Sequence, residues 1–175
     1  MKKLMDAESL VLAILDALPT HEVHGKKRIQ KLAFFAVQTG TASNVRFFLH
    51  DFGPFSADVA NAIDVLSYVG AVSEKEAQSV RTKRHYKVYR LADSESIEQH
   101  LPSAALNALR KLNDYSTIEL EIASTIRYFI QKGYSPQAAI QETKELKPTK
   151  AATRIIERAK EALAGVDLYE RGRTD

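Results

Sequence analysis

The sequence predicts an α+β protein, mostly α-helical, with a winged-helix-like N-terminal domain over residues 1–93 and a C-terminal helical subdomain over residues 94–175 that packs on it. Apolar residues recur at helical spacing through most of the chain. An alternating run at residues 85–91 follows the apolar residues 71–73 and predicts a small β-hairpin, the wing. After about Asp93 only helical patterns follow, so the order is helix, helix, strand, helix, hairpin and then helices.

Local signals delimit the elements of the N-terminal domain. Pro19 ends the first helix, and Gly40 is the expected C-terminal cap of the second. Gly53 and Pro54 mark a turn, after which the Ser56 side chain is suited to cap the third helix. We expect helices over residues 7–18, 26–38 and 57–69 and a short aromatic strand over residues 45–50.

The wing and the helical subdomain complete the prediction. Residues 71–73 and 85–91 form the two strands of the wing, and the charged segment 74–83 is expected to be its long basic tip. The subdomain is read as four amphipathic helices, with a Ser-Pro start signal at Ser135 and Pro136. These helices are expected over residues 103–112, 118–133, 136–146 and 150–164. Besides packing on the core, their apolar faces are compatible with a homodimer.

Composition excludes several classes of site. The 175 residues are 45% hydrophobic and contain no cysteine, so a core forms without disulfides, and a thiol nucleophile or cysteine-based zinc site is excluded. The formal net charge of +3 is too small to establish a polyanionic partner by itself. No segment approaches the ~18 apolar residues of a membrane span, and no signal-peptide cleavage site follows the N-terminus. We therefore expect a cytoplasmic protein without a membrane partner.

The positive charge is concentrated in two groups. Residues 1–93 hold 13 Lys and Arg against 10 Asp and Glu, whereas the remaining residues are balanced. Cationic side chains neutralise phosphates and release counterions, so both groups are hypothesised to contact a nucleic-acid backbone. The candidate residues are Lys26, Lys27, Arg28, Lys31, Arg81, Lys83, Arg84 and Lys87. The alternatives are that hairpin cations protect an edge strand and that lysine stems cover apolar surface.

The helix over residues 57–69 favours a different partner. Its expected exposed face carries Asp58, Asn61 and Asp64 and no cation, so a phosphate-lined groove would repel it. These three residues are the candidate partner-binding residues of the alternative function, a protein-interaction module of the antitoxin or adaptor kind.

Catalytic and metal-binding patterns are weak. His21 and His24 lack the i, i+4 spacing of a zinc helix, and the segment 21–24 is interpreted as a polar connecting loop. His50 and Asp51 resemble an acid–base pair, but Asp51 is better suited to satisfy turn N–H groups. No phosphate loop, nucleophile elbow or kinase signature is present. We expect no enzyme activity, no catalytic residues, no metal site and no cofactor.

Three segments resemble a known family. KRIQKLAFF at 27–35, FFLHDFGPFS at 47–56, and the helix leading to Gly70 are together similar to the YwgA-like proteins, and more distantly to the SocA-like (Panacea) antitoxin domains. Phe52 and Phe55 stand where tyrosines are usual. Residues 120–126, with the later Lys-Pro pair at 147–148, resemble the helical tail of that family. The resemblance implies a winged-helix-like fold with a helical appendage.

The leading hypothesis is therefore a winged-helix module that binds nucleic-acid backbone, DNA in the first instance, as a regulator. It requires both basic groups to lie on one face of the folded protein, which the sequence does not establish.

Overall fold

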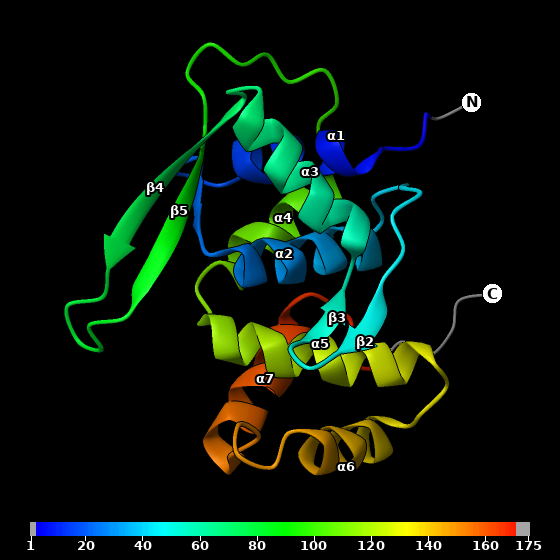
Figure 1. Cartoon of the computed structure of the whole chain (residues 1–175). Helices are drawn as coiled ribbons and strands as arrows, with labels where there is room; N and C mark the ends of the chain where they lie inside the picture. The colour runs from blue at the N-terminus through cyan, green and yellow to red at the C-terminus, as the bar shows by residue number, and fades with distance from the viewer. Residues whose placement is uncertain (1–2, 171–175) are drawn as a thin grey trace.

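Seven helices and five strands make up the described part of the computed structural model, residues 3–170 (Figure 1). In chain order they are α1 (Ala7–Ala17), β1 (Glu22–His24), α2 (Lys26–Gln38), β2 (Phe48–His50), β3 (Gly53–Phe55), α3 (Ala57–Tyr68), β4 (Val72–Gln78), β5 (His85–Leu91), α4 (Ser103–Leu112), α5 (Thr117–Gln131), α6 (Pro136–Leu146) and α7 (Thr153–Gly165). The protein is α+β and mostly helical, as the sequence predicts.

The seven predicted helices are confirmed, with ends within three residues of the expected ones. Their caps explain why local sequence suffices. The Ser56 hydroxyl accepts a hydrogen bond from the Val59 N–H at the start of α3. Ser116 and Glu119 form a capping box at the start of α5, and Ser135 caps α6 immediately before its first proline.

The strands differ more from the prediction. The segment 21–24 is not a loop, because β1 pairs with β5 and Val23 is buried opposite Tyr89. The prediction of a long basic tip over residues 74–83 is also wrong. Strand β4 continues to Gln78, because residues 72–78 pair with β5 while their charged side chains remain exposed to solvent. The loop between the strands is therefore shorter than predicted. The strand predicted over residues 45–50 is confined to β2, which pairs with the unpredicted β3.

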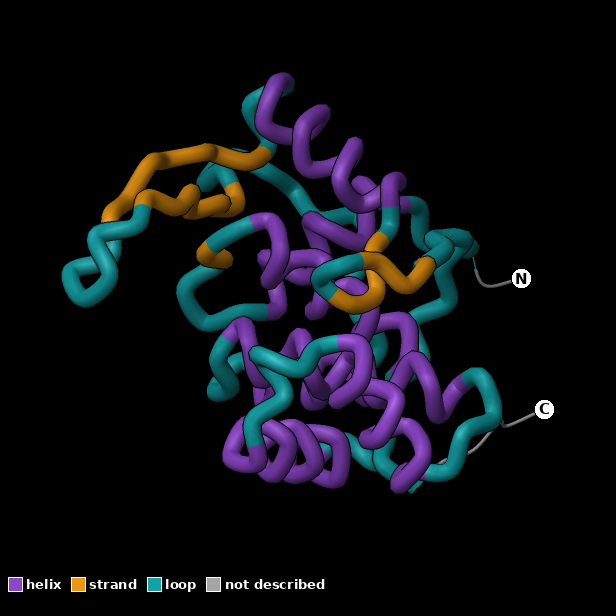
Figure 2. Tube along the Cα trace, turned by 60° about the horizontal axis from the view of Figure 1, so that its bottom comes forward, coloured by secondary structure: helices purple, strands orange, loops and turns teal. Residues whose placement is uncertain are grey.

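Two small antiparallel sheets result. One has the strand order β1-β5-β4, and the other consists of β2 and β3 alone. The long hairpin of β4 and β5 leaves the body of the molecule, and its loop lies far from the helices in both views (Figures 1 and 2). The buried Val72 and Tyr89 fix the base of this hairpin to the core.

Helix α2 is the central element. It packs against α1 and α3 of the N-terminal half and against α4 and α5 of the C-terminal half. Side chains of both halves belong to one hydrophobic cluster, which includes Leu32 and Phe35 of α2 and Ile122 and Ile126 of α5. The described residues after Asp93 thus share one core with the N-terminal half, and α2 lies between the two.

Candidate functional site

The cations at the start of α2 are bound to the protein itself. The Lys26 ammonium lies 2.5 Å from an Asp64 carboxylate oxygen, and this hydrogen bond raises the pKa of Lys26. The Arg28 guanidinium donates to the main-chain oxygens of Asn113 and Tyr115, both at 2.8 Å, and so fixes α2 to the connection between α4 and α5. The unfavourable position of these cations at a helix N-terminus is compensated from within the fold.

Lys31 lies in the interior, with 1% of its surface exposed, and its ammonium donates to the Pro54 carbonyl at 2.7 Å. Lys31 and Arg28 therefore do not belong to an exposed basic surface, contrary to the prediction. The reason is tertiary: α5 and the β2–β3 turn cover the side of α2 that carries Lys31. Lys27 is partly exposed but lies 3.8 Å from Glu121.

Among the described residues, cations without an ion pair lie both at the loop of the hairpin and on its strands. Lys87 forms an ion pair with Glu74 on the neighbouring strand, which raises the pKa of Lys87. Lys75 and Arg90 of the two strands are exposed, and neither has an ion pair with a described residue. Arg81, Lys83 and Arg84 are exposed, and none of the three has an ion pair with a described residue. We call these three residues the hairpin tip. The two predicted basic groups therefore do not form one common surface of free cations.

The acidic face of α3 is exposed as predicted. Asp58 and Asn61 border a depression of about 360 Å³ together with Asp6, Glu8 and Asn44. Asp64, in contrast, is engaged by Lys26. Within the described residues, no group of three His, Asp or Glu side chains is placed to hold a metal ion, including those around this depression.

A buried carboxylate with several lysines is the feature that sequence reasoning missed. Glu121 of α5 is 1% exposed. It accepts hydrogen bonds from Lys147 at 2.9 Å and from Lys150 at 2.9 and 3.2 Å. Burial alone would raise the pKa of Glu121, but the hydrogen bonds and positive charges of Lys147 and Lys150 together outweigh burial and lower it. With Lys27 and Lys31, these residues form what we call the Glu121 cluster.

The Glu121 cluster holds the β2–β3 turn. The Lys147 ammonium donates to the Asp51 main-chain oxygen at 2.6 Å, and Lys31 donates to that of Pro54. Burial, together with the positive charge of the three other lysines, lowers the pKa of Lys31 to about 7, although Glu121 opposes the change. The turn is therefore fixed by lysines from α2 on one side and from the α6–α7 connection on the other.

Gln30 completes this attachment, because its side-chain amide donates to the Ser56 carbonyl at 2.8 Å and accepts from the Ser56 N–H at 2.9 Å. The sequence signal that was available is the placement of Gln30 and Lys31 within an apolar helical run, and of Glu121 between Leu120 and Ile122. Polar residues in such positions are buried only when they are paired.

His50 and Asp51 are not arranged as an acid–base pair. The His50 ring lies 5.5 Å from the Phe55 ring, and Asp51 contributes its main-chain oxygen to Lys147.

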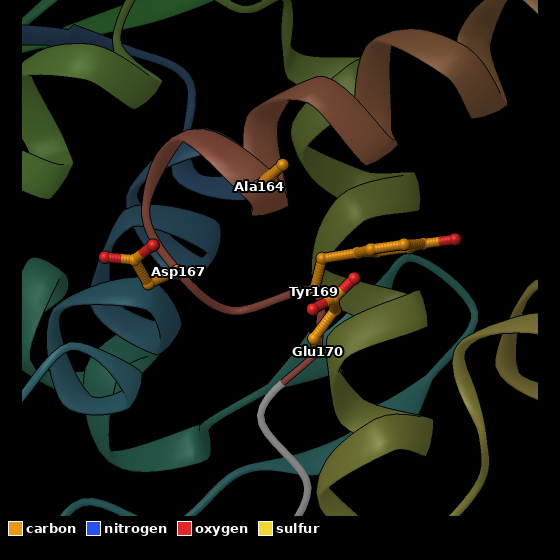
Figure 3. A pocket seen from close by; sticks show the side chains of 4 residues that line it. All are labelled: Ala164, Asp167, Tyr169 and Glu170. Atoms are coloured by element: carbon orange, nitrogen blue, oxygen red, sulfur yellow. The ribbon is translucent and has the colours of Figure 1, made fainter.

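Elsewhere, a cavity of about 490 Å³ at the end of α7 is lined by Ala164, Asp167, Tyr169 and Glu170. In Figure 3 the Asp167 side chain points away from Tyr169 and Glu170, so the lining side chains do not converge on one point.

No helix in residues 3–170 combines the length and apolar character needed to cross a bilayer. A scan against models of known protein families finds no match to this chain, and a search of the curated proteins finds no similar sequence. The functional argument therefore depends on the geometry described above.

Proposed function

We propose that this protein is a winged-helix-like binding module whose hairpin tip contacts nucleic-acid backbone. The element order supports this proposal. Leaving aside the inserted β2–β3 pair, the chain runs α1, β1, α2, α3, β4, β5, and β5 lies between β1 and β4. This order resembles the one typical of winged-helix proteins, and in this proposal β4 and β5 act as the wing.

The observation that carries the proposal is the hairpin tip. Arg81, Lys83 and Arg84 are exposed on a loop that extends away from the body (Figures 1 and 2), and the described structure brings no carboxylate into an ion pair with them. Each neutralised phosphate contributes about −0.9 to the slope of log K against log salt concentration. Three contacts give a slope of about −3, whereas eight would give about −7. Binding is therefore weak and independent of sequence.

The test is binding to a random DNA duplex, measured by fluorescence anisotropy at several salt concentrations. The charge-reversed variant R81E/K83E/R84E is expected to lose salt-dependent binding because its phosphate contacts are removed. The matched control is K132E/K144E/R154E, which changes the same amount of charge at exposed positions without ion pairs among the described residues. Equal loss in both variants, or no binding of the unaltered protein at low salt, would refute the proposal.

A protein-interaction module of the antitoxin or adaptor kind is the second candidate, and exposed aromatic residues favour it. Phe48 and Phe55 are cross-strand neighbours on β2 and β3, with exposed fractions of 67% and 36%. Exposed aromatic side chains of this kind are enriched at protein interfaces. Asp58 and Asn61 remain available on α3 for the same purpose, whereas Asp64 is paired. Loss of DNA binding in both charge-reversed variants would leave this candidate as the better one.

A further inference from the structure

The Glu121 cluster contains more positive charge than its carboxylate balances. Four lysines, Lys27, Lys31, Lys147 and Lys150, interact electrostatically with one another and with Glu121. Lys31 and Lys147 are buried, and charges removed from water are stable only when they are paired. Even with Lys31 neutral, three ammonium groups face one carboxylate, so an additional anion would be bound favourably.

Two of these lysines are accessible to such an anion. The side chains of Lys27 and Lys150 are 38% and 32% exposed. Their ammonium nitrogens lie 3.8 and 3.2 Å from the same Glu121 oxygen, Oε2. Because both nitrogens approach one atom, a single small anion is able to bridge them.

Phe52 holds the same two ammonium groups at the surface. The Lys27 nitrogen lies 3.8 Å and the Lys150 nitrogen 4.6 Å from the centre of the Phe52 ring, and the ring itself is 48% exposed. Contact with the ring face orders both side chains. The groups are thus positioned before a ligand arrives, which reduces the entropy that binding would otherwise cost.

We propose that Lys27 and Lys150, beside Phe52, bind a phosphate group, either inorganic phosphate or the phosphate of a small monoester. A phosphate carries a charge of about −1.5 to −2 near neutral pH and offers three acceptor oxygens. It therefore balances the excess charge of the cluster better than chloride or a single carboxylate does. The site is separate from the hairpin tip and does not depend on the nucleic-acid proposal.

In the primary experiment the full chain is titrated with inorganic phosphate at pH 7, and binding is measured by isothermal calorimetry. Thermal unfolding in phosphate is compared with thermal unfolding in chloride of equal ionic strength. Phosphate is expected to raise the melting temperature, because ligand binding to the folded state stabilises it. Loss of one charge-assisted contact weakens binding by about tenfold. The variants K27M and K150M are each expected to show this loss, whereas K144M, at an exposed lysine without an ion pair in residues 3–170, retains full affinity.

A conservative variant separates binding from folding. K150R keeps the cation and is expected to retain phosphate binding. Loss of binding in K150M but not in K150R would identify the charge as the cause. Should K150M fail to fold, K27M provides the same measurement at the other lysine.

The reversal R81E/K83E/R84E is expected to bind phosphate normally, which keeps the two proposals distinguishable. Identical behaviour in phosphate and chloride, or unchanged affinity in K27M and K150M, would overturn the proposal. A mononucleotide that binds more tightly than inorganic phosphate would identify a monoester as the ligand, and equal affinity would identify free phosphate.

Discussion

At the scale of single residues, Gly53 of the β2–β3 turn combines a left-handed backbone with a close neighbour. Its φ of +85° lies in the left-handed region, and an added Cβ would lie 2.8 Å from Thr125 Oγ1. Gly70, with a φ of +80°, has no atom within 4 Å of such a Cβ. The two glycines therefore share the backbone requirement and differ only in the space around them.

This difference gives the first stability prediction. Gly70→Ala is expected to lower the free energy of unfolding by about 1 kcal/mol, the cost of a left-handed conformation for a residue with a Cβ. Gly53→Ala is expected to cost a further 1–3 kcal/mol or so, because it also overpacks the contact with α5. Urea denaturation of both variants measures the difference, and equal costs would show that α5 does not constrain the turn.

At the scale of elements, the packing of α2 against α5 makes stability depend on pH through Lys31. Its pKa is about 7 in the folded protein, lowered by burial and by the neighbouring lysines, against an ordinary value of 10.5 in the unfolded chain. Between these values the unfolded state binds more protons, so stability rises with pH. Below the folded pKa both states are protonated, and the dependence disappears.

We therefore expect the free energy of unfolding to increase by roughly 1 kcal/mol per pH unit between pH 7 and pH 9. Lys31→Met is expected to remove this increase, because the side chain no longer titrates, whereas Lys144→Met retains it. Lys26 and Lys87, whose pKa values are raised by Asp64 and Glu74, lose stabilisation only at higher pH. Chemical denaturation at four pH values measures the slope, and an unchanged slope in Lys31→Met would contradict the assignment.

The elements also show what the sequence was able to predict. Helix limits follow from periodicity and caps, which are local, and they were found within a few residues. Charge compensation is not local: Lys26 meets Asp64 38 residues away, and Lys87 meets Glu74 across a strand pair. Strand β1 was missed because three residues with one buried position carry no pattern of their own and form a strand only beside β5.

At the scale of the whole molecule, the arrangement of contacts separates a rigid body from a projecting hairpin. The Arg28 guanidinium binds main-chain oxygens of the C-terminal half, and Lys147 of that half binds the β2–β3 turn of the other. The hydrophobic cluster is likewise shared between the halves. The boundary near residue 93 thus divides the chain but not the core.

The shared core predicts one cooperative unfolding transition. Separation of the halves would expose the apolar side chains that they share and would leave Arg28 without the main-chain oxygens of Asn113 and Tyr115, so neither half is expected to be stable alone. Calorimetry of the full chain is expected to give equal calorimetric and van't Hoff enthalpies, and a fragment of residues 1–93 is expected to lack dispersed amide resonances.

A variant in which the loop over residues 79–84 is replaced by a two-residue turn is the control. It is expected to remain cooperative, because that loop makes no part of the buried cluster. Two separate transitions, or a folded 1–93 fragment, would show that the N-terminal half is an independent domain and that α5 only covers it.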